Sequence, residues 1–184
     1  MVVRRLNNNP SFLKRFIGIL RVIYPFISAV IAVIGSVAWF KGADSASSAP
    51  LLALAVIYYW RSTRPFLLPF WTLAMLSLLQ DFVSGSLLGF HFFIFLPTII
   101  LTQMKFIWRF GNLFAPAWLW FIIVVATCFS IEIVISFFIQ LYQSAQIINP
   151  LDGIWRYILT WTCYPLVAWL LTSLDRWVVR MRAG

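Results

Sequence analysis

Long apolar stretches separated by short polar segments dominate the pattern of this chain. Three of them, residues 22–40, 116–142 and 154–175, contain few charged side chains. A helix needs about 20 apolar residues to cross the roughly 30 Å hydrocarbon core of a bilayer, because each residue rises about 1.5 Å. Each stretch reaches that length, so the pattern predicts three membrane-spanning helices.

The apolar run over residues 66–104 is almost twice as long as one crossing needs. Its only polar break is residues 80–86, which read Gln-Asp-Phe-Val-Ser-Gly-Ser. Gly85 permits a positive φ, and the acid and serines around it can cap the backbone groups that helix ends leave exposed. We therefore predict two helices, over 66–80 and 87–104, joined by a tight hairpin.

A shorter apolar stretch, residues 47–60, rises only about 21 Å as a helix and would cross a thinned bilayer or tilt within a bundle. The distribution of Lys and Arg decides whether it spans, because short cytoplasmic loops carry an excess of both. With six spans and a cytoplasmic N-terminus, only Lys41 and Arg156 of the 14 basic residues face outward. Without this helix, eight of the 14 face outward and the bias disappears. We therefore predict six spans.

These elements predict an all-α polytopic membrane protein, a six-transmembrane-helix bundle with both ends in the cytoplasm. The membrane domain covers residues 22–178, between a basic cytoplasmic segment at 1–21 and a basic tail at 179–184. The first apolar run exceeds the roughly 7–15 residues of a signal-peptide core, so we expect a retained helix rather than a cleaved leader.

Composition supports a membrane protein and excludes several other classes. Hydrophobic residues make up 62% of the chain and charged residues 10%, against roughly 45–50% and about 25% in soluble domains. The net charge of +9 does not indicate a nucleic-acid partner, because the basic residues are scattered and form no dense patch. Cys128 and Cys163 both lie inside predicted spans, so we expect neither a disulfide nor a metal site, and no cofactor is indicated.

Glu132 is the one acidic residue well inside a long predicted span, where a charge is costly unless it meets a partner. Ser136 and Gln140 follow at four-residue spacing on the same helix face, and Tyr157 and Tyr164 offer polar groups at matching depth on the next span. These five residues are candidates for a polar pocket that opens outward. They also fit a structural strut, in which Glu132 is protonated or hydrogen-bonded and holds helices together.

Arg61 and Arg64 lie at the predicted cytoplasmic end of the short second helix, just before Pro65. This basic anchor could bind lipid phosphate or a cytoplasmic protein, or it could serve only to fix the topology.

A catalytic site is not indicated. Ser84 or Ser86 with His91 would suit a hydrolase by distance along the chain, but no G-x-S-x-G, H-E-x-x-H, C-x-x-C or G-x-G-x-x-G motif accompanies them. His91 is the only histidine, so it cannot build a metal site by itself. We therefore expect a protein that is not an enzyme.

The stretch from Tyr59 to His91 resembles the core of the rod shape-determining protein MreD family. The elements that carry the likeness are an aromatic-Trp pair, an Arg-Pro step, a D-x-x-S-G motif and a Leu-Gly step before the histidine, here Tyr59-Trp60, Arg64-Pro65, Asp81 to Gly85 and Leu88-Gly89. Their order and spacing are more specific than any one of them.

The resemblance implies a multi-pass protein of the bacterial inner membrane that has no catalytic activity and binds MreC. Through MreC it would work with the MreB filament, RodA and a class B penicillin-binding transpeptidase in cell-shape maintenance and sidewall peptidoglycan synthesis. The family is similar in fold to the six-helix S-components of energy-coupling-factor transporters. A small-molecule-binding membrane subunit is therefore the alternative.

Five residues of the hairpin are candidates for the partner interface, namely Asp81, Ser84, Gly85, Gly89 and His91. The small residues let helix backbones approach closely, which matters where lipid supplies no hydrophobic drive between helices. We expect the hairpin and the short second span to shape a surface for a single-span partner.

Overall fold

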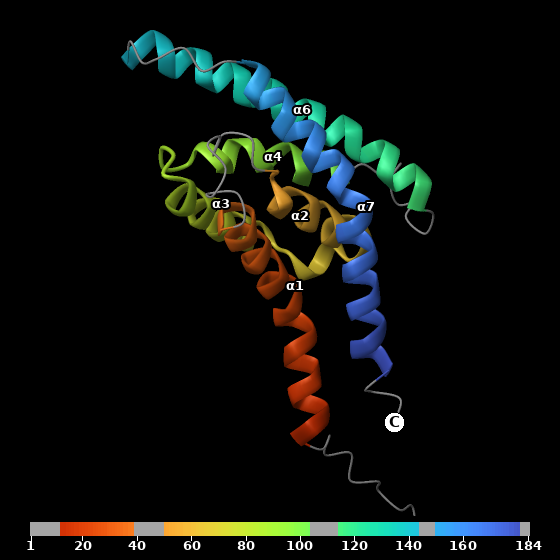
Figure 1. Ribbon diagram of the computed structural model, residues 1–184. Coiled ribbons are helices and arrows are strands. Elements are labelled where there is room, and N and C mark those ends of the chain that lie inside the picture. The colour runs from red at the N-terminus through yellow and green to blue at the C-terminus, as the bar shows by residue number, and fades with distance from the viewer. Residues whose placement is uncertain (1–11, 39–49, 104–113, 144–149, 181–184) are drawn as a thin grey trace, which may run out of the picture.

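The computed structural model of the chain describes residues 12–38, 50–103, 114–143 and 150–180. It is helical throughout the described elements, which confirms the predicted all-α class. Figure 1 shows the elements, which are α1 (Phe12–Ala38), α2 (Leu52–Thr63), the 3-10 turn η2 (Pro65–Leu67), α3 (Phe70–Ser84), α4 (Phe90–Gln103), α6 (Phe114–Gln143) and α7 (Pro150–Arg180). Lys41, part of the basic N-terminal segment and most of the basic tail lie outside the described residues.

The six helices follow the order of the six predicted spans, with shifts at their ends. The largest shift is in α1, which begins at Phe12 instead of residue 22, since Leu, Lys and Arg in the basic segment favour a helix. At the start of α3 two prolines delay the helix. Pro65 opens the 3-10 turn, and Pro69 lies in an extended conformation with φ −66° and ψ 165° immediately before Phe70.

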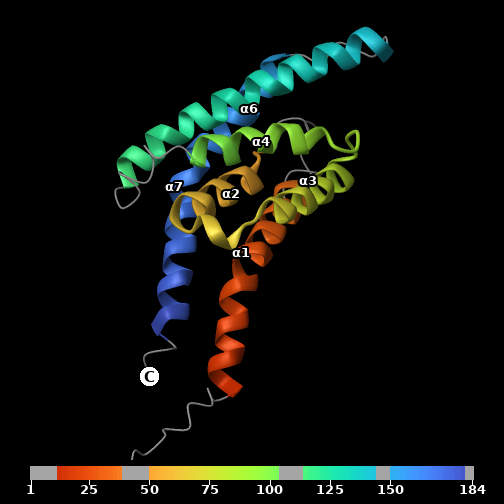
Figure 2. The same ribbon diagram turned by 180° about the vertical axis from the view of Figure 1, so that it is seen from behind.

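The short helix α2 occupies the centre of the bundle. Every residue from Ala53 to Arg61 is buried, and α2 packs against α1, α4 and α7. Both ribbon views show it surrounded by longer helices (Figures 1 and 2). At 12 residues it rises about 18 Å.

Polar groups of α2 are hydrogen-bonded to the helices around it. The bonds, with donor–acceptor distances, run from Leu51 N to Thr160 Oγ1 (2.9 Å), Tyr58 OH to Ala117 O (2.8 Å), Tyr59 OH with Thr172 Oγ1 (3.0 Å) and Trp60 Nε1 to Ser28 Oγ (3.0 Å). They join α2 to α1, α6 and α7. The centre of the bundle is therefore held by hydrogen bonds as well as by apolar packing.

Prolines lie near the middle of α1 and α7. Pro25 and Pro165 each remove one backbone donor from their helix, and such positions commonly bend a helix. Both helices bend about midway, and the first half of α1 and the second half of α7 project on the same side of the bundle (Figures 1 and 2). The two ends of the described chain therefore lie on one side, as an even number of crossings would place them.

The outer surface of the bundle is rich in large apolar side chains, including Phe66, Trp71 and Phe82, which are 89%, 78% and 73% exposed. Within the described residues two stretches, Pro116–Leu141 of α6 and Gly153–Arg176 of α7, are long and apolar enough to cross a membrane by themselves. The apolar parts of α1, α3 and α4 are shorter. Such a surface is typical of helices that face lipid.

Candidate functional site

Asp81, in the last turn of α3, organises the hairpin between α3 and α4. Its Oδ2 atom accepts a hydrogen bond from the Gly89 amide at 2.6 Å, and its Oδ1 atom accepts from the His91 amide at 3.0 Å and from His91 Nδ1 at 2.7 Å. The Ser86 hydroxyl donates to the same Oδ1 at 3.0 Å. Asp81 and His91 are both buried. We call Asp81, Ser86, Gly89 and His91 the hairpin clasp.

The clasp satisfies backbone groups that the helix ends would otherwise leave unpaired. The first amides of a helix have no partner within it. A carboxylate beside them accepts their hydrogen bonds and also interacts favourably with the positive end of the helix dipole. At the other end of the turn, Gly85 adopts the left-handed conformation with φ 71° and closes α3 through a bond from its amide to Asp81 O. Gly89 also has a positive φ, 89°. The D-x-x-S-G spacing therefore has a structural explanation in the turn itself.

The geometry around His91 differs from that of a catalytic triad. In a triad the nucleophile and the acid contact opposite nitrogens of the imidazole, so that one nitrogen takes the nucleophile's proton while the acid orients the ring and stabilises its charge. Here Ser86 Oγ lies 3.2 Å from His91 Nδ1, the same nitrogen that contacts Asp81. Ser84 Oγ instead donates to Gln80 O at 2.6 Å. The arrangement fits a helix cap and does not match a serine nucleophile paired with a general base.

Glu132 meets two side chains of α7 inside the bundle. Its Oε2 atom accepts from Arg156 Nη2 at 3.1 Å and from the Tyr157 hydroxyl. The Arg156 guanidinium also lies over the Tyr157 ring, 5.5 Å from its centroid. The carboxylate and guanidinium side chains are 16% and 17% exposed. We call Glu132, Arg156 and Tyr157 the α6–α7 ion-pair cluster.

The structure brings together only part of the predicted polar pocket. Glu132 and Tyr157 are in contact, whereas Tyr164 lies two turns further along α7 and packs on Phe121, with ring centroids 4.6 Å apart. Ser136 and Gln140 continue along α6 beyond Glu132 and are half-buried. The pocket and strut hypotheses both stay predictions, and the pairing of Glu132 fits the strut.

Sequence reasoning missed the role of Arg156. The count of basic residues treated it as an outward-facing charge, but α7 begins at Pro150 and so carries Arg156 within the helix. The sequence did contain a signal for this pairing. Arg156 and Tyr157 lie on the predicted span that follows the one with the internal acid Glu132. Helix α4, which carries His91, packs against α6, which carries Glu132, and α6 packs against α7, which carries Arg156.

The two residues of the predicted basic anchor lie at the corner between α2 and α3. Arg61 is 7% exposed and donates from Nη1 to Leu68 O at 3.0 Å. Arg64 is more exposed and forms an ion pair with Asp175 of α7, with Nη2 and Oδ2 2.8 Å apart. Both contacts hold this corner in place. A role towards lipid phosphate stays a prediction.

Within the described residues, no three His, Cys, Asp or Glu side chains gather in a way that could hold a metal ion. Cys128 and Cys163 are free thiols. Cys128 is buried, with its Sγ 3.8 Å from Thr98 Oγ1.

Comparison with known proteins supports the resemblance found in the sequence. The family model of rod shape-determining protein MreD matches residues 14–174. The matched range includes the hairpin clasp and the ion-pair cluster. Comparisons with curated proteins and with solved structures give no match.

Proposed function

Because the chain belongs to the rod shape-determining protein MreD family, we propose that it is a non-catalytic membrane scaffold of the bacterial rod complex. Members of this family are membrane proteins with a role in rod-shape determination. In our proposal the chain binds MreC in the cytoplasmic membrane. It supports sidewall peptidoglycan synthesis through MreC, with MreB, RodA and a class B penicillin-binding transpeptidase as indirect partners.

The observation that carries the proposal is an apolar surface on α3 and the hairpin. Four exposed side chains recur on one face of α3 at helical spacing, and two more lie at the tip. These side chains form the hairpin face, which comprises Trp71, Met75, Leu78, Phe82, Leu87 and Leu88. A face of this kind suits a single-span partner helix, because packing between helices in lipid depends on close van der Waals contact.

The hairpin clasp lies on the buried side of the hairpin and holds the hairpin face in position. Of the five predicted interface residues, Asp81 and His91 are buried, whereas Ser84 and Gly85 are exposed at the tip. The buried pair would therefore position the hairpin face, and the exposed pair would lie in the contact itself. A rigid face loses less conformational entropy when a partner binds.

The test uses the double variant Phe82→Ala with Leu88→Ala, because both side chains are exposed, at 73% and 68%. We expect the yield of MreC that co-purifies from membranes to fall severalfold, since two large contacts are truncated. The matched control is Leu119→Ala with Ile123→Ala on α6, where the side chains are also exposed. The proposal is wrong if the hairpin-face variant inserts normally and retains as much MreC as the control.

Glycine substitutions in the hairpin are poor tests of the interface. Gly85 and Gly89 have φ values of 71° and 89°, which side-chain-bearing residues rarely adopt. Replacing either with a larger residue would strain the turn and disturb the clasp. A loss of partner binding in such a variant would not separate folding from contact.

We also propose that all six helices cross the membrane and that both ends are cytoplasmic. Lengths and compositions of α6 and α7 support the crossing of these two helices. The side of the membrane on which the corner between α2 and α3 lies can be tested with Phe66→Cys, because this side chain is 89% exposed and belongs to η2. Labelling by a membrane-impermeant maleimide only after the cells are opened is expected, and labelling of intact spheroplasts would contradict the topology.

A further inference from the structure

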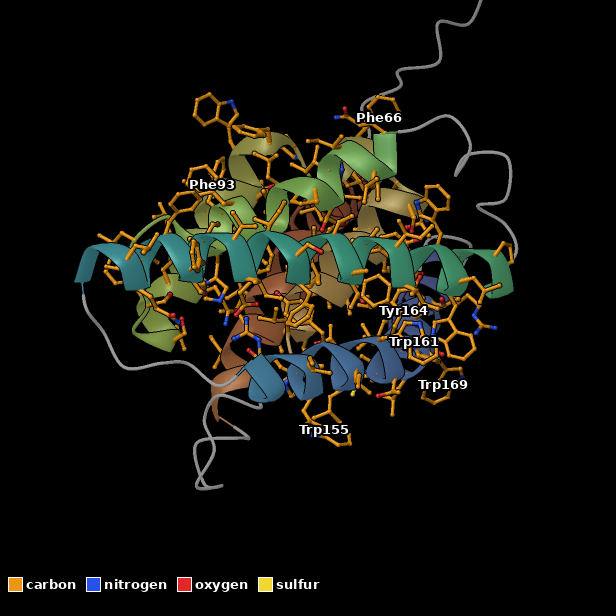
Figure 3. The ribbon with its side chains drawn as sticks, turned by 90° about the horizontal axis from the view of Figure 1, so that it is seen from above. Phe66, Phe93, Trp155, Trp161, Tyr164 and Trp169 are labelled. Atoms are coloured by element: carbon orange, nitrogen blue, oxygen red, sulfur yellow. The ribbon has the colours of Figure 1, made fainter. Side chains whose placement is uncertain are left out.

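The surface between α6 and α7 contains a groove of about 220 Å³. It is lined by Ile122, Val125, Ala126 and Phe129 of α6 and by Tyr157, Ile158 and Trp161 of α7. We call it the α6–α7 groove. Figure 3 shows Trp161 and Tyr164 pointing towards α6, whereas Trp155 and Trp169 point away from it. The exposed surface of the groove is entirely apolar, which suits a hydrocarbon chain better than a water-soluble ligand.

One end of the groove is charged. Glu132 follows Phe129 by one helical turn, and Arg156 precedes Tyr157, so the α6–α7 ion-pair cluster lies at that end. The Nε atom of Arg156 is buried and has no hydrogen-bond acceptor among the described residues. Both hydrogen bonds that Glu132 accepts from α7 involve its Oε2 atom. The pair therefore offers both a cationic donor group and a carboxylate oxygen with remaining capacity.

Arg156 can reach the headgroup region of a bilayer from this position. It is the seventh residue of α7, which begins at Pro150, so it lies about 9 Å along the helix axis from the first residue. A long arginine side chain extends further towards the membrane surface. The apolar part of the groove then lies at the depth of acyl chains.

We propose that the α6–α7 groove binds one phospholipid with a zwitterionic aminophosphate headgroup, that is, a phosphatidylethanolamine. One acyl chain lies along the apolar lining, the phosphate contacts Arg156 and the ammonium contacts Glu132. The reason for this choice is charge complementarity. An adjacent cation and anion match a headgroup that carries both charges, whereas the Glu132 carboxylate repels a purely anionic headgroup.

The test measures which lipid the purified protein retains. Wild-type protein is placed in nanodiscs of equal phosphatidylethanolamine, phosphatidylglycerol and phosphatidylcholine, extracted in mild detergent and examined by native mass spectrometry. We expect one retained phosphatidylethanolamine. The variant Ala126→Trp fills the groove from an exposed position and should reduce retention by about tenfold, because the chain and the indole cannot share the space.

The matched control is Ile123→Trp, which adds the same side chain at an exposed position of α6 outside the groove lining. It should retain lipid like the wild type. Glu132→Gln should bring the ratio of retained phosphatidylethanolamine to phosphatidylglycerol close to one, since the ammonium loses its carboxylate. Arg156→Gln should weaken retention of both by about tenfold, the effect of losing a charge-assisted hydrogen bond.

Three results would overturn the proposal. They are equal retention by Ala126→Trp and Ile123→Trp, preferential retention of phosphatidylglycerol or an added polyprenyl phosphate by the wild type, and a second copy of the chain bound in place of lipid. The proposal does not depend on MreC binding, because the hairpin face and the groove lie on different helices. Failure of one can therefore be told from failure of the other.

Discussion

Helices α2 and α6 show opposite ways of placing a helix in this bundle. α2 has 12 residues, of which nine in succession, Ala53 to Arg61, are buried. α6 has 30 residues, but only 17% of its most apolar part is buried inside the protein. The more apolar and longer helix therefore lies at the edge, and the shorter one lies at the centre.

The difference in side chains explains the difference in position. α2 carries Tyr58, Tyr59 and Trp60, whose polar groups all find partners on surrounding helices. The exposed side chains of α6 are mostly Leu, Ile, Val and Phe, which need no partner in lipid. In a membrane, polar groups gain from turning inward because the bilayer core offers no hydrogen bonds. The high hydropathy of α6 therefore goes with an exposed position at the edge of the bundle and not with burial in the protein.

Truncation of Trp60 should produce the largest effect and tests this comparison directly. Its side chain is 1% exposed, so Trp60→Ala leaves a cavity and removes the partner of Ser28, and the free energy of unfolding should fall by about 3–5 kcal/mol. The matched variant Phe138→Ala on α6, at 64% exposure, should change it by less than about 1 kcal/mol. Reversible unfolding in bicelles measures both. Equal losses of unfolding free energy in the two variants would contradict the conclusion that α2 lies inside the bundle and α6 at its edge.

Removal of the Asp81 carboxylate should come next. Asp81→Ala leaves the amides of Gly89 and His91 and the imidazole without their acceptor, which should cost about 2–3 kcal/mol. Hydrogen exchange at the first turn of α4 should accelerate in parallel. Ser84→Ala serves as the control, because Ser84 is exposed and its hydroxyl bonds to Gln80 O and Ser86 Oγ and not to α4. Unchanged exchange in Asp81→Ala would show that the cap contributes little to the hairpin.

Glu132 tests whether α6 also contributes a polar interior contact despite its exposed surface. Glu132→Gln keeps an acceptor for the Tyr157 hydroxyl but leaves the Arg156 charge unpaired, so the free energy of unfolding should fall by about 1–2 kcal/mol. In the double variant with Arg156→Gln part of this loss should be recovered. A double-mutant cycle measures the coupling, and additive effects would mean that the ion pair does not act as a unit.

Arg64 should give the smallest effect. The Arg64 and Asp175 side chains are 28% and 24% exposed, and ion pairs with access to solvent typically contribute about 0.2–1 kcal/mol. Arg64→Ala should therefore lower the free energy of unfolding by less than about 1 kcal/mol, and added salt should reduce the difference further. Arg176→Ala is a matched control at an exposed site on α7. If Arg64→Ala lowered the free energy of unfolding by more than about 2 kcal/mol, the ion pair would behave like a buried one, and Arg64 would belong to the interior of the bundle together with α2.

The order and number of the helices in the described part of the chain could be predicted from the sequence because apolar length is a local property. The hairpin was visible as the one polar break in residues 66–104, and the charge count recovered the short α2. The residues at which the helices begin and end were less predictable. α1 starts ten residues before the predicted position because helix formers precede the apolar run, and two prolines delay α3. End positions depend on turn geometry, which a count of apolar residues does not include.

The candidate site was less predictable because its contacts join distant residues. The spacing of Asp81, Gly85 and Gly89 indicated a turn, but the carboxylate bonds to the start of α4 depend on how the two helices meet. Glu132 was found through its unusual position in a span, whereas Arg156 was counted only as an outward-facing charge. Charge counts treat each arginine as a topology signal, and they cannot identify one that pairs within a bundle.

The enclosure of α2 has a consequence for synthesis in the cell. Leu51 and Tyr59 find their hydrogen-bond partners in Thr160 and Thr172, more than 100 residues later in the chain. Until α7 leaves the ribosome, these groups of α2 lack their final contacts, so the translocon or the surrounding water must accommodate them. Maturation of this protein therefore requires α7, and quality-control proteases will meet a centre that lacks these hydrogen bonds in any chain that stops before α7.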